Sequence, residues 1–152
     1  MEAGISDLLD PRWMTLDLQA RDREEAIREL AGLLERAGKL DDPEQFVAAV
    51  LARESQGSTA VGMGVAIPHG KSPAVREAAV AFGRSSRGVD FPAPDDQPVD
   101  LVFLIAAPEG AHDWHLQALA RLARRLMHDD VRAALRAARA PEEVIRALEE
   151  RG

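Results

Sequence analysis

Residues 99–106, VDLVFLIA, are almost wholly apolar, and this run restricts the fold more than any other feature of the chain. A strand with side chains of this kind is buried on both faces of its sheet. Amphipathic helical patterns lie before and after it, so helices are expected to cover both faces. We therefore predict an α/β fold, a three-layer sandwich in which a mixed, mostly short-stranded sheet is flanked by helices.

The remaining elements follow from periodicity and from capping residues. Residues 15–19 alternate as a short strand does, and Asp22 stands three residues before Glu25, the spacing of a capping box at a helix start. Asp42 precedes a proline and opens a second helix, which should end near Glu54. Further strands are predicted at 65–67 and 78–83, a proline-rich loop at 92–98, and helices at 114–127, 130–139 and 141–150. The apolar stripe of the first of these helices is predicted to comprise Leu116, Leu119, Ala120, Ala123 and Met127.

Composition limits where such a chain works and what it binds. Its 152 residues suit one domain over 1–152, and the absence of cysteine excludes disulfides and favours a reducing compartment. No apolar run approaches the roughly 18 residues of a membrane span, and the first residues lack a signal-peptide core. The net charge of −7 argues against nucleic-acid binding and permits a basic protein partner. We expect a cytoplasmic domain that does not insert into a membrane.

The segment 64–72, GVAIPHGKS, ends in Gly-Lys-Ser as a phosphate-binding P-loop does. A P-loop requires glycine five positions before the second glycine, and Val65 stands there. The residues before the motif also resemble a strand, whereas the phosphates of a P-loop are held at a helix start. The sequence therefore argues against nucleotide binding.

His69 is the residue of this segment with reactive chemistry. Pro68 fixes its own φ and keeps Ile67 extended, and Gly70 is predicted to release the chain into a turn. The imidazole is thus expected at a strand end, held rigidly and within reach of a partner. A neutral imidazole is a nucleophile because its unperturbed pKa is about 6.5. An alternative is an ordinary exposed or hydrogen-bonded turn histidine.

Phosphohistidine chemistry also needs donors that hold the charge of a phosphoryl group, since phosphoryl transfer depends mainly on positioning and charge stabilisation. Lys71, the hydroxyls of Ser58 and Thr59, and the amides of residues 57–64 are the candidates nearby in sequence.

An ordered set of residues resembles a known family. Glu54, Val61-Gly62 and residues 65–70 (VAIPHG) match in order and spacing the phosphorylation signature of type-2 EIIA domains of the bacterial phosphotransferase system, which include fructose, mannitol and nitrogen-related EIIA proteins. The resemblance also includes Arg53 and Ser58-Thr59, and it extends downstream to the strand ending at Ala107-Pro108, to His115-Leu116 and to the leucine/alanine helix that follows. It covers essentially the whole chain.

This resemblance implies a phosphocarrier with the family's mixed sheet between helices and without a metal or organic cofactor. His69 would accept a phosphoryl group from the phosphohistidine of HPr. It would then pass the group to a cysteine of an EIIB domain, or its phosphorylation state would regulate a protein target. Lysine directly after Ile-Pro-His-Gly resembles the regulatory, nitrogen-related branch, and no EIIB or membrane segment is joined to this chain, so we favour that branch.

The resemblance gives roles to further residues. His115 matches the second active-site histidine, and a helix start there would favour phosphate. Arg53 matches a family arginine, whose guanidinium suits a phosphoryl group. Lys71 is a third candidate stabiliser. Each has an ordinary alternative: a partly buried helix-start histidine, a solvated charge closing a helix, and an exposed turn lysine.

Two rival interpretations stay open. A domain of this fold could act as a non-catalytic interaction module that binds partners irrespective of phosphorylation. His112 and His115 could share a helix face, but a metal site would require a third ligand. The sequence leaves the sugar, the downstream partner and the oligomeric state undetermined.

Overall fold

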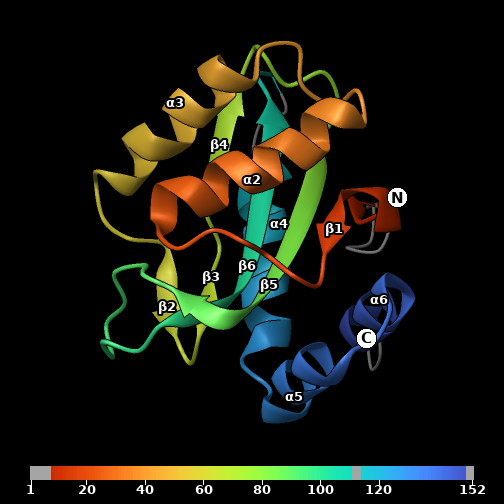
Figure 1. The fold of residues 1–152 in the computed structure, drawn as a ribbon. Coiled ribbons are helices and arrows are strands. Elements are labelled where there is room, and N and C mark those ends of the chain that lie inside the picture. Colours follow the sequence, from red (N-terminus) through yellow and green to blue (C-terminus); the bar gives the residue numbers. More distant parts are fainter. Residues whose placement is uncertain (1–7, 111–113, 150–152) are drawn as a thin grey trace.

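The centre of the molecule is a six-stranded mixed sheet (Figure 1). The computed structural model describes residues 8–110 and 114–149, without the side chains of residues 114 and 115. Strand β6 is parallel to β3 and β4 and antiparallel to β5. The sheet order is β1 (Met14–Thr15), β5 (Ala79–Val89), β6 (Val99–Pro108), β3 (Val65–Ala66) and β2 (Ala60–Gly62), and β4 (His69–Ser72) pairs with β6 farther along.

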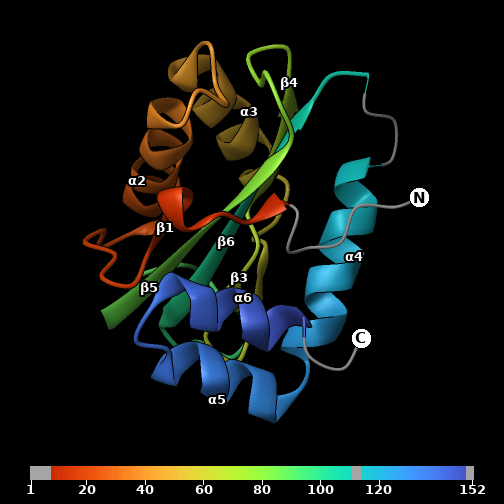
Figure 2. The same ribbon diagram turned by 90° about the vertical axis from the view of Figure 1, so that its right-hand side faces the viewer.

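Helices cover both faces of this sheet (Figure 2). Helices α2 (Arg23–Arg36) and α3 (Pro43–Glu54) lie on one face, and α4 (Trp114–Leu126) lies on the other. The short helices α5 (Asp129–Ala137) and α6 (Pro141–Glu149) join the core of the second face, and a 3₁₀ turn, η1 (Pro11–Trp13), precedes β1. The predicted three-layer α/β architecture is confirmed.

Strand β6 explains why its sequence is almost continuously apolar. Val102 and Leu104 point into the core beneath α2 and α3, whereas Phe103 and Ile105 point into the core beneath α4. Successive side chains of a strand alternate between its faces, so a strand covered on both sides needs apolar residues at every position. β6 is the central strand that the sequence predicted.

The two N-terminal helices begin and end where the sequence places them. The carboxylate of Asp22 accepts a hydrogen bond from the Glu25 amide at 2.9 Å, and that of Asp42 accepts one from Gln45 at 3.1 Å. These side chains satisfy amides that lack partners within the first helical turn. Gly38 follows α2 with φ of 80°, a conformation that favours glycine.

Several boundaries differ from the prediction. β1 is shorter, because the Thr15 hydroxyl accepts a hydrogen bond from the Asp17 amide and turns the chain. β5 continues beyond Gly83 to Val89, and β2 lies in a stretch that was predicted only to be non-helical. Strands as short as β1 and β2 carry little periodic signal, and the extent of all three is decided by pairing with neighbours distant in sequence.

The apolar stripe predicted for α4 is correct only in part: Leu119 and Ala123 are partly buried and pack against the core of that face, whereas Leu116, Ala120 and Met127 are exposed. The helix buries Ala118, Leu122 and Leu126, whereas Leu116 is 50% exposed and Met127, just past the helix end, is 70% exposed. Leucine and alanine occur on more than one side of this helix, so periodicity alone does not decide which side faces the sheet.

Residues 65–72 follow β6 as one strand interrupted at Pro68. Before the proline, Val65 pairs with Leu101, and after it His69 pairs with Ile105. Proline lacks an N–H, and the Ile67 amide instead donates to the Thr59 carbonyl at 3.2 Å. The interruption was predicted, but the turn at Gly70 was not correct: the chain continues as β4.

Gly70 has a packing role in place of that turn. A Cβ atom at this position would lie 2.8 Å from Cγ2 of Val50 and 3.4 Å from Cε1 of Phe46, both on α3. The absence of a side chain therefore allows β4 to approach α3 closely. Glycine gives the same sequence signal for a turn and for close packing, and here the packing explains it.

Candidate functional site

His69 opens β4 directly after the interruption of the strand. β4 packs between α3 and α4 and is paired with β6, so the residue is only 7% exposed. The sequence predicted a readily reachable side chain at a strand end, and the structure buries it more deeply. The imidazole is therefore largely covered by its surroundings.

The backbone sets the tautomer of the imidazole. Nδ1 of His69 lies 3.0 Å from the carbonyl oxygen of Ile67. A carbonyl oxygen only accepts hydrogen bonds, so Nδ1 must carry the proton in this contact. In the neutral ring the lone pair is then on Nε2, which makes Nε2 the nucleophilic nitrogen.

Lys71 shares a face of β4 with His69. Side chains along a strand alternate, and Gly70 faces α3, so residues 69 and 71 face the side of the sheet that α4 covers. Lys71 is exposed, and its ammonium group is therefore available to an anion near this edge. His115 lies in the first turn of α4, but its side chain is outside the described residues, as is His112.

Arg53 lies in the last turn of α3, on the other side of β4. Its Nη1 donates to the Gly57 carbonyl at 2.8 Å and so holds the loop that follows the helix. The side chain is half-buried and retains further donors for a second acceptor. The contact shown is structural, and the phosphate role that the resemblance gives to Arg53 stays a prediction.

The two hydroxyls proposed as phosphate donors are engaged elsewhere. Ser58 Oγ donates to the Pro92 carbonyl at 2.5 Å and accepts from the Ala60 amide at 3.1 Å. Thr59 is buried, and its hydroxyl donates to the carboxylate of Glu54. Both side chains hold the loop between α3 and β2 in these contacts, and their role as phosphate donors stays a prediction.

The sequence reasoning assigned no role to Glu54, although it is part of the signature. It is 3% exposed, and its carboxylate also accepts from the Thr59 amide at 3.3 Å and lies 3.5 Å from Nη1 of Arg23. A signal was present, because Glu54 follows Val50 by four residues and so continues the buried stripe of α3. An acidic residue at such a position is rarely buried without partners.

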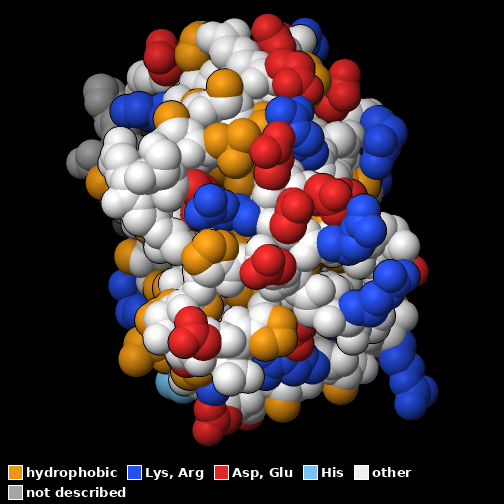
Figure 3. Space-filling view, turned by 60° about the vertical axis from the view of Figure 1, so that its left-hand side comes forward, with side chains coloured by type: hydrophobic (Ala, Val, Ile, Leu, Met, Phe, Trp, Pro, Cys, Tyr) orange, Lys and Arg blue, Asp and Glu red, His pale blue; other side chains and the backbone are white. Residues whose placement is uncertain are grey.

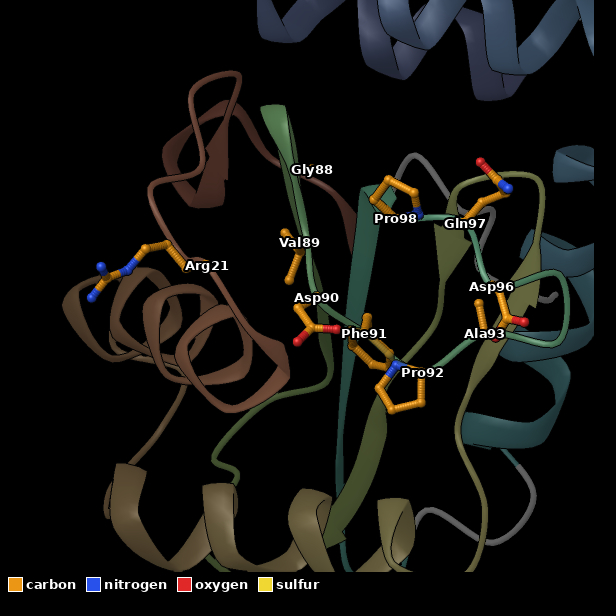
Figure 4. Close-up of a pocket in the computed structure, with 10 residues that line it drawn as sticks. All are labelled: Arg21, Gly88, Val89, Asp90, Phe91, Pro92, Ala93, Asp96, Gln97 and Pro98. Atoms are coloured by element: carbon orange, nitrogen blue, oxygen red, sulfur yellow. The ribbon is translucent and has the colours of Figure 1, made fainter.

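A pocket lined entirely by described residues lies away from His69. The pocket in Figure 4 has a volume of about 400 Å³ and lies between the start of α2 and the loop 92–98. It is lined by Arg21, Gly88, Val89, Asp90, Phe91, Pro92, Ala93, Asp96, Gln97 and Pro98. None of the predicted site residues is among them, so the site at His69 is a strand edge and not this pocket.

The distribution of charged side chains on the surface agrees with the net charge of −7, which argued against nucleic-acid binding. On the face in Figure 3, basic side chains alternate with acidic ones and form no continuous basic stripe. Across the described residues, no helix combines the length and apolarity that crossing a membrane requires, and no cluster of three or more His, Cys, Asp or Glu could hold a metal ion.

The fold and this site define an α/β domain of the EIIA type. The family described as "Phosphoenolpyruvate-dependent sugar phosphotransferase system, EIIA 2" matches residues 7–151. The chain belongs to this family.

Individual relatives carry both transport and regulatory names. A fructose-specific EIIABC component of Bacillus subtilis is 44% identical over 93% of this chain, which spans only 22% of that longer protein. A nitrogen regulatory protein of Bradyrhizobium diazoefficiens is also 44% identical, over 89% of this chain and 88% of its own length. The crystal structure of IIA-Ntr from Neisseria meningitidis is similar, with a TM-score of 0.87, 36% identity, and coverage of 95% of this chain and 98% of that chain.

Proposed function

We propose that this chain is a phosphocarrier that accepts a phosphoryl group on Nε2 of His69 from an HPr-type protein. The contact between Nδ1 and the Ile67 carbonyl carries the proposal, because it places the lone pair of the ring on Nε2. Family membership supports the reaction class, and the register of β4 supports a rigid ring.

The transfer is an exchange between two imidazoles. The Nε2 lone pair attacks phosphorus, and the P–N bond of the donor phosphohistidine breaks as the new P–N bond forms. The donor nitrogen keeps the electron pair of the broken bond. Nδ1 of His69 keeps its proton and its hydrogen bond throughout, so the imidazolium-like charge of the product is stabilised by a fixed carbonyl.

Three side chains are proposed to stabilise the phosphoryl group. Lys71 is exposed on the same face of β4 and is the candidate that the geometry supports most directly. His115, in the first turn of α4, and Arg53, at the end of α3, are carried from the family resemblance. Helix starts and guanidinium groups both suit phosphate oxygens.

The bound group then has two possible uses. Passage to the cysteine of an EIIB domain would serve sugar import, as the name of the EIIABC relative suggests. A regulatory target would fit the nitrogen-related relatives and the lysine after the signature. We favour regulation, with the whole chain acting as one cytoplasmic phosphocarrier domain.

The test is transfer of labelled phosphate from phosphoenolpyruvate through enzyme I and HPr. We expect label on the wild type and on His128→Ala, which removes an exposed histidine that makes no side-chain cap bond, and none on His69→Ala. Label on His69→Ala would move the acceptor to another residue. No label on any of the three proteins would favour a non-catalytic interaction module.

A further inference from the structure

Hydrogen bonds, linked through the backbone of Thr59 and of Ile67, connect the buried Glu54 to the ring of His69. The carboxylate of Glu54 accepts from the amide and the hydroxyl of Thr59. The Thr59 carbonyl accepts from the Ile67 amide at 3.2 Å, and the Ile67 carbonyl accepts from Nδ1 of His69 at 3.0 Å. The series passes from the end of α3 through the loop before β2 to the interruption in front of β4.

Each member of this series has little freedom to rearrange. The side chain of Glu54 is 1% exposed, and Thr59 and Ile67 are 7% and 1% exposed. A buried donor that loses its acceptor is not satisfied by bulk water, so these groups must either keep their bonds or move. Pro68 fixes the backbone on the other side of Ile67.

The one charged partner of Glu54 comes, among the described residues, from another helix. Nη1 of Arg23, in the first turn of α2, lies 3.5 Å from Oε1 of Glu54. The carboxylate therefore connects the start of α2 to the end of α3 and to the loop before β2.

We propose that Glu54 is a positioning residue for phosphoryl transfer: it holds Thr59, and through the Thr59 carbonyl the backbone of Ile67, so that Nδ1 of His69 stays protonated and Nε2 carries the lone pair. The inference rests on the proposed function of His69 and adds to it a residue that does not touch the phosphoryl group. No proton is transferred along the series. Its role is to fix the orientation of the Ile67 carbonyl.

Loss of the carboxylate has a defined consequence for the ring. Without it, the Thr59 amide and hydroxyl lose a shared acceptor, and the loop must shift to find others. The backbone of Ile67 then loses one of the contacts that fix it, its carbonyl can turn away from Nδ1, and the ring can adopt the tautomer with its proton on Nε2. That tautomer has no lone pair on the attacking nitrogen and cannot accept the phosphoryl group there.

The test combines a spectroscopic and a kinetic measurement on the full chain. In Glu54→Gln we expect ¹⁵N NMR of the His69 ring to show a rise in the Nε2–H tautomer. We expect kcat for transfer from phospho-HPr to fall about 10–100-fold, as is usual when a partner that orients a reacting ligand is removed. KM for HPr should stay unchanged, because Glu54 is buried.

Glu29→Gln is the matched control. The Glu29 carboxylate likewise accepts from loop amides, those of Gln19 and Ala20 at 3.0 and 2.9 Å, but has no described connection to β4. Its removal should change stability and leave both the tautomer and kcat at wild-type values. An equal effect of the two variants on kcat and tautomer would overturn the inference.

A second pair of variants decides the question if the Glu54 variant does not fold. Thr59→Val removes the hydroxyl and retains the backbone carbonyl, whereas Thr59→Ser keeps both. We expect a tautomer shift in the valine variant and wild-type behaviour in the serine variant. An unchanged tautomer in Thr59→Val would overturn the inference. Absence of label on the wild type would instead refute the proposed function, and the NMR result would still decide the role of Glu54.

Discussion

At the scale of single residues, Gly70 determines how closely β4 approaches α3. Gly70→Ala would place a Cβ 2.8 Å from the Val50 side chain and 3.3 Å from its amide nitrogen. Overpacking of this kind costs about 1–3 kcal/mol, and we expect that loss in the free energy of unfolding measured in urea. The neighbouring His69 should shift with the strand, so transfer from phospho-HPr should also slow.

A second glycine, Gly32, provides a control in which alanine should raise the free energy of unfolding instead of lowering it. In Gly32→Ala, within α2, the nearest atom to the new Cβ is Nη1 of Arg36 at 3.6 Å, an ordinary contact. Alanine is better than glycine in a helix interior by up to about 1 kcal/mol, so this variant should be more stable than the wild type. If Gly70→Ala were as stable as Gly32→Ala, close packing would not explain Gly70.

Single residues also mark where sequence reasoning succeeds and where it stops. The order Ile-Pro-His identified His69 because a proline restricts its neighbours whatever the tertiary structure. The burial of His69, the packing role of Gly70 and the contacts of Glu54 depend on the packing of helices and loops around β4, which a local sequence pattern does not reveal. The sequence also did not reveal that the hydroxyls of Ser58 and Thr59, proposed as phosphate donors, make hydrogen bonds within and beside their own loop.

At the scale of elements, the β2–β3 hairpin is held from outside the sheet. Arg136 of α5 donates from Nη2 to the Met63 carbonyl at 2.7 Å and makes a two-point contact with Asp100 at the start of β6. The hairpin carries two exposed apolar side chains, Val61 and Met63, which are 48% and 44% exposed. A fixed hairpin presents such a pair in one orientation, as a protein contact would require.

Arg136→Met should loosen this hairpin more than it destabilises the protein. The ion pair with Asp100 is partly exposed and contributes about 0.2–1 kcal/mol. We expect faster hydrogen exchange at the amides of Asp100 and Leu101, which donate to the Gly64 carbonyl, with a small change in global stability. Arg139→Met, at an exposed arginine nearby in sequence, should leave these amides unaffected. Equal exchange rates in the two variants would show that Arg136 does not hold the hairpin in place.

Low pH should break a second contact of the same hairpin, the hydrogen bond from the Met63 amide to Asp95. The carboxylate of Asp95 accepts hydrogen bonds from the backbone amides of Met63 and Gln97, and these bonds lower its pKa. The bond from Met63 has the larger effect. Because the folded pKa is depressed, the stabilisation is present above the unfolded value of about 3.9 and is lost as the pH falls through the lower folded value. The Met63 amide resonance should therefore titrate below the ordinary range of aspartate. In Asp95→Asn that titration should disappear, and its persistence would assign it to another group.

Element prediction was reliable where a local signal was complete. Capped helices such as α2 and α3, and the uniformly apolar β6, were placed within a few residues. The orientation of α4 was predicted only in part, and the short strand β2 was not predicted, because both are decided by packing or pairing with distant parts of the chain. Leu116 and Met127 illustrate this, because both were predicted to face the sheet and both are exposed.

At the scale of the whole molecule, one sheet separates two apolar cores that share its strands. Leu30 of α2 and Leu122 of α4 are each 0% exposed and lie in the cores on opposite faces. Because β6 contributes side chains to both cores in alternation, neither face can lose its packing without disturbing the other. The domain should consequently unfold as one cooperative unit.

Leucine-to-alanine changes on the two faces test this coupling. Leu30→Ala and Leu122→Ala should each lower the free energy of unfolding by about 2–5 kcal/mol, through lost burial and the cavity that remains. Each variant should keep a single transition, coincident when followed by far-UV circular dichroism and by NMR signals from both faces. The leucines share no contact, so their effects should add within about 0.5 kcal/mol if the double variant still folds. Separate transitions for the two faces would mean that the sheet does not couple them. In that case α4, whose first turn carries His115, could unfold while β4 stays paired with β6.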